Sequence, residues 1–187
     1  MAQTRLWILA ALLPLLIAPA CGGSSSDGGV TPDPACMDYT GDSIPVSNAV
    51  VTRLGVGSSC DLVRLDLIVT DVDAIFSAEF KFNYDPATVA FEGVTTDVSF
   101  LKSDGTQITD LVTVLSPGEV QVAITRLGGA SGGIDAVGEQ FLCRLWMRRN
   151  AGAGASSDPD FSLGRFFDIN QTEIAGVTWH GGRFEVQ

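Results

Sequence analysis

Apolar and polar residues alternate along most of the chain after residue 42, and turn-forming residues separate the alternating runs. In segment 79–84, Phe80, Phe82 and Tyr84 share one parity, and polar residues occupy the other. An alternation with a period of two is typical of a β-strand with one buried face, whereas helical periodicity is nearly absent. Strands are predicted over nine regions: 43–54, 62–70, 79–84, 88–94, 111–115, 120–125, 141–149, 161–167 and 177–186. These strands predict an all-β sandwich, whose two sheets pack through their apolar faces.

Segment 141–149 also alternates, and it carries a candidate for a contact surface. We expect its side chains to point in two directions, with Phe141, Cys143, Leu145 and Met147 facing the core and Arg144, Trp146 and Arg148 facing outward. An outward Trp between two Arg residues is typical of interface anchors, and a flat aromatic ring can also stack on a sugar. The alternative is that segment 39–45 folds over Trp146 and covers it.

The first 20 residues are a candidate signal peptide. Arg5 is followed by an apolar run over residues 6–17 and then by Ala18, Pro19 and Ala20. This order is typical of a secretory leader with a cleavage site. A helix of about twelve residues rises only about 18 Å, which is too short to span a bilayer. We therefore expect residues 1–20 to be removed on export.

Residues 18–21 resemble the lipobox of bacterial lipoproteins, although Ala18 stands where Leu is usual. The resemblance implies that Cys21 carries a lipid. Segment 21–37 begins with Gly, Ser, Asp and Pro residues and is expected to be a flexible linker, followed by one domain over residues 38–187. The prediction is an exported protein that is lipid-anchored to the bacterial cell envelope. The alternative is a freely secreted protein whose Cys21 joins a disulfide.

Three cysteines remain if Cys21 is lipidated. Cys143 lies in an apolar strand pattern and is expected to be a buried thiol. Cys36 and Cys60 flank the first strand region, and we predict that they form a disulfide in an oxidising compartment.

The charge of the chain narrows the range of partners. It carries 22 acidic and 11 basic residues, which gives a formal net charge of -11. This excess of negative charge argues against nucleic acid as a partner. It also repels anionic lipid, so we expect contact with a membrane only through the lipid anchor.

The order of the motifs resembles the cohesin modules of cellulosome scaffold proteins. Residues 80–86 have the form F-x-F-x-Y-D-P, and residues 89–94 have the form V-x-F-x-x-V. The similarity continues through the strand at 120–125, a Gly-rich loop at 128–133, the strand at 141–147, and the runs FFDINQTEI and GVTWHGGRFEV. It covers residues 45–187.

This resemblance implies a nine-stranded jelly-roll β-sandwich that is noncatalytic and binds a dockerin-like protein module through the face of one sheet. By position, it implies partner contacts from Ser77, Glu79, Lys81, Thr125, Leu127 and Gly128. Neighbouring families bind polysaccharide, so the alternative is carbohydrate binding by a sheet face, with Arg144, Trp146 and Arg148 as the candidate surface. A structural or adhesive envelope protein is the third hypothesis.

One short motif matches the sequence pattern around the nucleophile of serine hydrolases. Residues 129–133 fit the pattern G-x-S-x-G around Ser131, and Asp168 and His180 follow in hydrolase order. A nucleophile elbow requires a helix directly after the serine, and the sequence there has no helical pattern. We therefore expect an interstrand loop and no enzyme.

No cofactor is expected. Asp71 and Asp73, and separately Asp168 with Asn170 and Glu173, offer oxygen ligands for calcium. Neither group matches an EF-hand loop, so we expect solvated acids in turns. A zinc site is not expected either, because the chain has one histidine and no C-x-x-C motif.

Overall fold

A computed structural model describes residues 35–43, 47–128 and 132–187. All described residues belong to one compact unit, Asp33–Gln187. The predicted signal peptide, Cys21 and most of the predicted linker lie outside the described residues, as do Pro45 and Ser131.

The described residues form twelve strands and one 3-10 turn. The first six strands are β1 (Met37–Gly41), β2 (Ala49–Leu54), β3 (Leu62–Ile75), β4 (Ser77–Asn83), β5 (Val89–Thr95) and β6 (Ile108–Ser116). The others are β7 (Glu119–Arg126), β8 (Ile134–Arg149), β9 (Ser156–Ser157), β10 (Asp160–Phe167), β11 (Thr178–His180) and β12 (Gly182–Val186). The 3-10 turn η1 (Phe100–Lys102) lies between β5 and β6.

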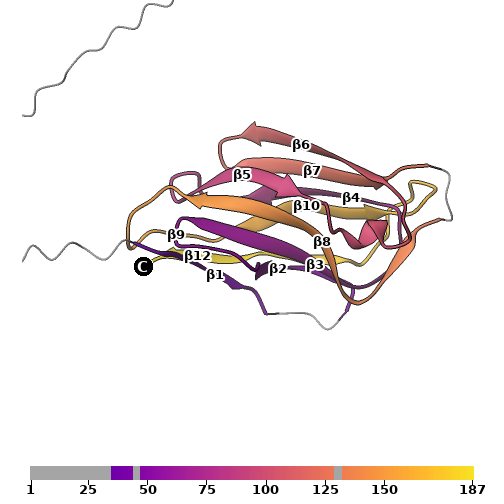
Figure 1. The fold of residues 1–187 in the computed structure, drawn as a ribbon, viewed down its shortest axis with the longest axis horizontal. Helices are drawn as coiled ribbons and strands as arrows, with labels where there is room; N and C mark the ends of the chain where they lie inside the picture. Colours follow the sequence, from indigo (N-terminus) through magenta and orange to yellow (C-terminus); the bar gives the residue numbers. More distant parts are fainter. Residues whose placement is uncertain (1–34, 44–46, 129–131) are drawn as a thin grey trace, which may run out of the picture. The chain divides into compact units, whose positions relative to one another are not determined.

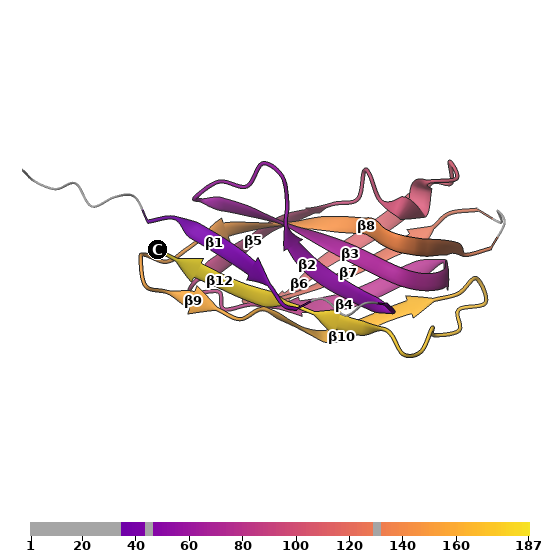
Figure 2. The same ribbon diagram turned by 90° about the horizontal axis from the view of Figure 1, so that it is seen from below.

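The strands form two main sheets and a smaller one. The four-stranded sheet has the order β10-β4-β7-β6, and the five-stranded sheet has the order β11-β2-β3-β8-β5. Figures 1 and 2 show these two sheets as facing layers, with the small β1-β12-β9 sheet along one side. All paired strands are antiparallel except β11 and β2. The predicted all-β sandwich is confirmed.

The core lies between the two main sheets. Phe80 and Phe82 on β4 are fully buried, and Tyr84 packs against the same core, as their shared parity predicted. Phe161 contacts both buried Phe rings at centroid distances of 5.8 and 5.3 Å. Burial of these rings contributes to the hydrophobic stabilisation that closes the sandwich.

The twelve observed strands include all nine predicted regions. Strands β1 and β9 were not predicted, because strands this short carry too few alternations of apolar and polar residues. The predicted closing strand 177–186 is divided at Gly181 into β11 and β12. A Cβ at Gly181 would lie 2.0 Å from the carbonyl oxygen of Pro159, so no larger residue fits at this crossing.

The predicted inward position of Phe141 is wrong. In the ladder between β3 and β8, Leu67 pairs with Cys143 and the next residue, Ile68, pairs with Phe141. Leu142 is therefore the extra residue of a β-bulge, which reverses the alternation on one side of it. Leu142 and Cys143 are both buried, whereas Phe141 is half-buried beneath the guanidinium of Arg144.

A disulfide joins Cys36 to Cys60, and Cys143 is a buried free thiol. Burial raises the pKa of the Cys143 thiol well above its usual range. Beside the disulfide, the backbone of Cys36 exchanges two hydrogen bonds with Gln187, each 2.9 Å long. Closing a loop of this length stabilises a fold by about 3 kcal/mol. The first described strand is thus fixed both to the last strand and to the loop before β3.

Candidate functional site

The outer face of the four-stranded sheet carries the predicted partner-binding residues. The burial of β4 alternates, with Ala78, Phe80 and Phe82 in the core and the residues between them half-exposed. Strand β7 alternates in the same way, with Val120, Val122 and Ile124 in the core. The remaining residues of both strands therefore form one continuous outer surface.

The register aligns four rows of side chains across this face, each written here from β10 to β6. The first row holds Phe167, Ser77, Thr125 and Thr109; the second holds Arg165, Glu79, Ala123 and Leu111; the third holds Leu163, Lys81, Gln121 and Thr113; the fourth holds Asp160, Asn83, Glu119 and Ser116. The structure thus brings Ser77 and Thr125 directly opposite each other, with Glu79 and Lys81 in the next two rows. We call these four rows the recognition face.

Polar contacts fix one end of the recognition face. The amide of Gln121 donates a hydrogen bond of 2.6 Å to Glu79, and the Lys81 ammonium lies 3.3 Å from the carboxylate of Glu119. Asn83 donates to Asp160 at 2.8 Å. Side chains that are already oriented lose less conformational entropy when a partner binds.

The other end of the recognition face is hollowed. A pocket of about 280 Å³ is lined by Phe76, Ser77, Thr125, Phe167 and Gln171. It exists because two small hydroxyl residues lie beside the ring of Phe167, which projects outward. Pockets with apolar walls and a few polar groups are typical of the sites where a partner inserts an anchor side chain.

Leu127 and Gly128 follow the end of β7 beside this pocket. The side chain of Leu127 is 45% exposed, and its backbone N–H donates to the carbonyl of Gln107 at 2.8 Å. Gly128 has a φ of 86°, a left-handed conformation that favours glycine. With Leu111, which is 67% exposed, Leu127 gives the recognition face an apolar margin.

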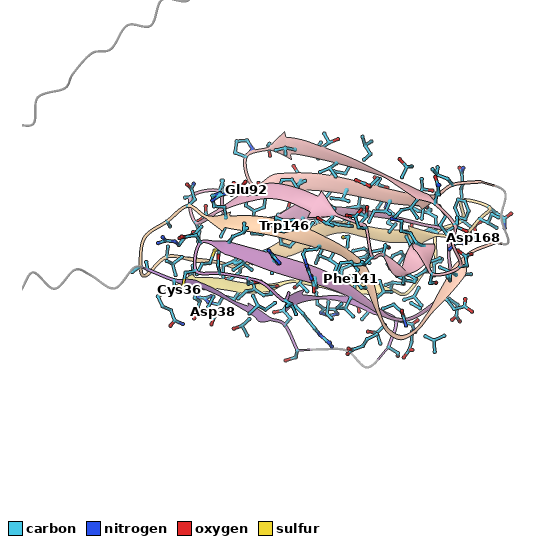
Figure 3. All side chains as sticks on the ribbon, in the orientation of Figure 1. Cys36, Asp38, Glu92, Phe141, Trp146 and Asp168 are labelled. Carbon is cyan, nitrogen blue, oxygen red and sulfur yellow. A yellow bond between two sulfur atoms is a disulfide. The ribbon has the colours of Figure 1, made fainter. Side chains whose placement is uncertain are left out.

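A second candidate surface lies on the outer face of the five-stranded sheet. Arg144, Trp146 and Arg148 all point outward from β8, as predicted, and Figure 3 shows Trp146 beside Glu92 on β5. Each of the two arginines has an acidic partner. Arg144 forms two hydrogen bonds with Asp66, and Arg148 lies 2.6 Å from Glu92.

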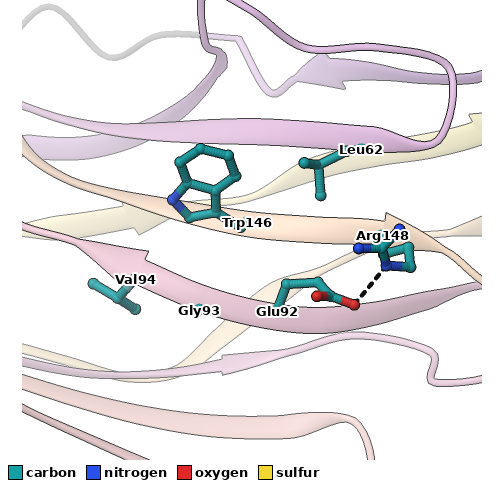
Figure 4. Close-up of a pocket in the computed structure, with 6 residues that line it drawn as sticks. All are labelled: Leu62, Glu92, Gly93, Val94, Trp146 and Arg148. Atoms are coloured by element: carbon teal, nitrogen blue, oxygen red, sulfur yellow. Dashed lines mark hydrogen bonds and ion pairs between the residues drawn. The ribbon is translucent and has the colours of Figure 1, made fainter. Parts of the chain in front are cut away.

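Trp146 is not covered by Tyr39 of the N-terminal segment. The Tyr39 ring is buried against Phe184 at a centroid distance of 4.9 Å, and its hydroxyl bonds to Thr52. A pocket of about 340 Å³ instead opens beside Trp146, and Figure 4 shows the six residues that line it: Leu62, Glu92, Gly93, Val94, Trp146 and Arg148.

The candidate catalytic and calcium groups have other partners. His180 bonds to the hydroxyl of Thr178 at 2.9 Å. Asp168 accepts 2.8 Å bonds from the backbone N–H groups of Asn170 and Thr172, which lower the pKa of its carboxyl. Asp71 accepts from the N–H of Gly138 at 2.8 Å. The Asp168 carboxylate therefore stabilises the turn after β10, and the Asp71 carboxylate links β3 to β8.

Within residues 35–43, 47–128 and 132–187, no group of three or more His, Cys, Asp or Glu side chains is arranged to hold a metal ion. In the same part of the chain, no helix has the length and apolar character that crossing a bilayer requires.

The sequence did not identify the pocket-forming residues Phe76, Phe167 and Gln171. A signal existed for Phe167, because two consecutive phenylalanines on one strand cannot both face the core and Phe166 is the buried one. The contribution of Phe76 depends on the crossover between the two sheets. At that crossover the chain passes from one sheet to the other, so no alternation of apolar and polar residues predicts where the Phe76 side chain points.

Comparison with solved structures identifies the fold. The chain is similar to the second type II cohesin module from the ScaA scaffoldin of Acetivibrio cellulolyticus, with a TM-score of 0.55, 9% identity, and coverage of 81% of this chain and 90% of that chain. It is also similar to the cohesin module of a family 33 glycoside hydrolase from Clostridium perfringens. The TM-score is 0.51 at 13% identity, and the match covers 82% of this chain and 96% of that chain. A third similar structure is the sixth cohesin of scaffoldin B from A. cellulolyticus in complex with a Cel5 dockerin. The TM-score is 0.50 at 14% identity, and the match covers 79% of this chain and 96% of that chain.

A scan against family models finds no match for the sequence, and a search of curated proteins finds none either. The structural similarity nevertheless defines the class of the domain. It has a cohesin-like fold, as the order of its sequence motifs predicted.

Proposed function

We propose that this domain is a noncatalytic recognition module that binds a dockerin-like protein through its recognition face. The contacts are assigned to Ser77, Glu79, Lys81, Thr125, Leu127 and Gly128. The cohesin-like fold supports this function, and one structure with the same fold is a complex with a dockerin.

The observation that carries the proposal is the pocket between Ser77 and Thr125. It lies on a sheet whose opposite side is a packed aromatic core, so the backbone beneath it is rigid. A helical module that presents an apolar side chain can place it in the pocket, and the hydroxyls at the rim can bond to the surrounding backbone of the partner. Because the polar network at the other end is already ordered, little freedom is lost on binding.

Thr125→Arg is expected to weaken partner binding by about 30-fold or more, because the long charged side chain fills the pocket and must be desolvated. Proteins are first captured from the secretome of the source organism by the immobilised domain, with calcium and then with chelator. Affinities of the captured partner are then measured by calorimetry. Thr178→Arg, an exposed threonine on β11 in the other sheet, is the matched control and is expected to bind normally.

Two results would contradict the proposed function. One is a secretome capture that yields no dockerin-like protein in either condition. The other is a captured dockerin-like protein that binds the Thr125→Arg variant as tightly as the unmodified domain.

We further propose that the domain is exported and held at the bacterial envelope by a lipid on Cys21. When the full chain is expressed in a bacterium with an alkyne-tagged fatty acid, the protein is expected to take up the label and to sediment with membranes. Cys21→Ser is expected to abolish both, because the serine hydroxyl cannot form the thioether. Cys143→Ser is the control and should retain the label, since that thiol is buried. Equal labelling of the Cys21→Ser variant would exclude this mode of attachment.

A further inference from the structure

The pocket beside Trp146 lies on the five-stranded sheet, on strands that contribute nothing to the recognition face. Its volume of about 340 Å³ falls at the small end of the range for ligand sites, which begins at about 300 Å³. Leu62 and Trp146 supply the apolar part of its lining, and Glu92 and Arg148 supply the polar part (Figure 4). Val94 pairs with Leu145 and packs against the core, so only the backbone of β5 faces the pocket at this position.

The Trp146 ring is fixed before any ligand arrives. Its indole N–H donates a 2.9 Å hydrogen bond to the hydroxyl of Thr95. The guanidinium of Arg64 lies over the ring, 4.5 Å from the centroid. Both contacts set the orientation of the indole, so its free edge forms a stationary wall of the pocket.

Gly93 leaves the floor of the pocket open. It pairs with Trp146 across the ladder between β5 and β8, next to a β-bulge after Phe91. A Cβ at Gly93 would meet no atom within 4 Å. The backbone conformation there is one that other residues adopt, because its φ is not positive. The fold therefore does not require glycine at this position, and the open space is available to a ligand.

An acidic and a basic side chain pair at the rim of the pocket. Nε of Arg148 donates to Oε1 of Glu92, and this bond lowers the pKa of the Glu92 carboxyl. Because both side chains are largely exposed, the remaining guanidinium N–H groups and carboxylate oxygen stay accessible. Within this pair, donors and acceptors stand side by side with no net charge, and the Arg64 guanidinium over Trp146 adds one positive charge nearby. That arrangement suits vicinal hydroxyl groups better than it suits an anion or a cation.

We infer that this pocket binds one ring of a neutral oligosaccharide. The apolar face of a pyranose packs against Leu62 and the edge of Trp146 above the bare backbone of Gly93. Two of its hydroxyl groups exchange hydrogen bonds with Arg148 and Glu92. A single-ring site of this kind has a dissociation constant on the order of 1 mM. The inference is independent of the proposed protein partner, which uses the opposite sheet.

The test follows the indole N–H signals of the isotope-labelled full chain by NMR as oligosaccharides are added. The probes are cellohexaose, xylohexaose and mannohexaose. At least one of them is expected to shift the Trp146 signal with saturation. Trp179 is the internal reference and is expected to stay unchanged, because its indole nitrogen is buried.

Gly93→Val is the decisive variant, because it fills the pocket where the fold has room for a side chain. It is expected to unfold at the same temperature as the unmodified chain and to bind the active probe at least about tenfold more weakly, a loss of about 1.4 kcal/mol. Thr109→Val on the recognition face is the control and should bind normally. Trp146→Ala should also lose binding, but it removes the contact with Arg64 as well.

Three outcomes would overturn the inference. The first is that none of the three probes shifts the Trp146 signal at about 10 mM, which is tenfold above the expected dissociation constant. The second is normal binding by Gly93→Val. The third is a Trp146 signal that responds to a captured protein partner and to no oligosaccharide, which would assign the pocket to a protein interface.

Discussion

Gly164→Ala is expected to destabilise the domain by roughly 3 kcal/mol, although it adds a single methyl group. Gly164 faces the core from β10, and a Cβ at this position would lie 2.4 Å from two ring atoms of Trp179. The ring cannot move aside, because Phe80, Phe161 and Phe166 surround it at centroid distances between 5.2 and 5.5 Å. Urea denaturation measures the loss. Gly152→Ala is the control, since a Cβ there meets nothing within 4 Å.

A double-mutant cycle identifies the cause. Trp179→Ala alone is expected to cost about 3 kcal/mol through the cavity that it leaves. In that background the added methyl group has room, so Gly164→Ala should cost little more. The two effects are therefore expected to be strongly non-additive. Additive losses would show that Trp179 is not what excludes a side chain at residue 164.

Arg126→Met is expected to destabilise the domain by about 2 to 3 kcal/mol at neutral pH. The Arg126 side chain is only 1% exposed. It donates to the carbonyl of Leu101 at 2.7 Å and to Asp104 and Thr106, and so holds the segment around η1 against the end of β7. Methionine fills similar space but donates no hydrogen bond. Lys102→Met is the control, because that side chain donates only to the exposed carbonyl of Asp97.

The cost of Arg126→Met should also depend on pH. The hydrogen bond from Arg126, assisted by the backbone N–H of Thr106, lowers the pKa of Asp104 to about 2. An unfolded aspartate titrates near 3.9. The stabilisation from Asp104 is therefore complete above about pH 4 and is lost as the pH falls through about 2. Urea unfolding of both proteins should show their difference shrinking over this interval. A difference that stays constant would exclude the Asp104 carboxylate from the interaction.

The sequence pattern predicted strands well wherever one face is buried. The alternation in β4 was sufficient to separate Phe80 and Phe82 from Ser77 and Glu79, because parity within one strand is a local property. It failed at Phe141, where three consecutive apolar residues allow two registers and a bulge opposite β3 selects one of them. A bulge depends on the partner strand, and the sequence of β8 alone does not contain it.

The candidate sites were likewise predictable only as far as they depend on a single strand. That Ser77 faces outward follows from its own strand, but its position opposite Thr125 depends on a pairing between β4 and β7, which are distant in the sequence. The pocket beside them also needs Phe76 from the crossover and Gln171 from the turn after β10. Likewise, an outward Trp146 was predictable, whereas the open space beside it depends on Gly93 of another strand.

The link between Cys36 and Cys60 has a mechanical consequence. A force applied to the chain on the N-terminal side of residue 36 is transmitted through the disulfide directly to the loop that leads into β3. Without that bond, the same tension would detach β1 from β12 one hydrogen bond at a time, beginning at the contact between Cys36 and Gln187. In an oxidising environment the domain should therefore resist being peeled open from its amino-terminal end.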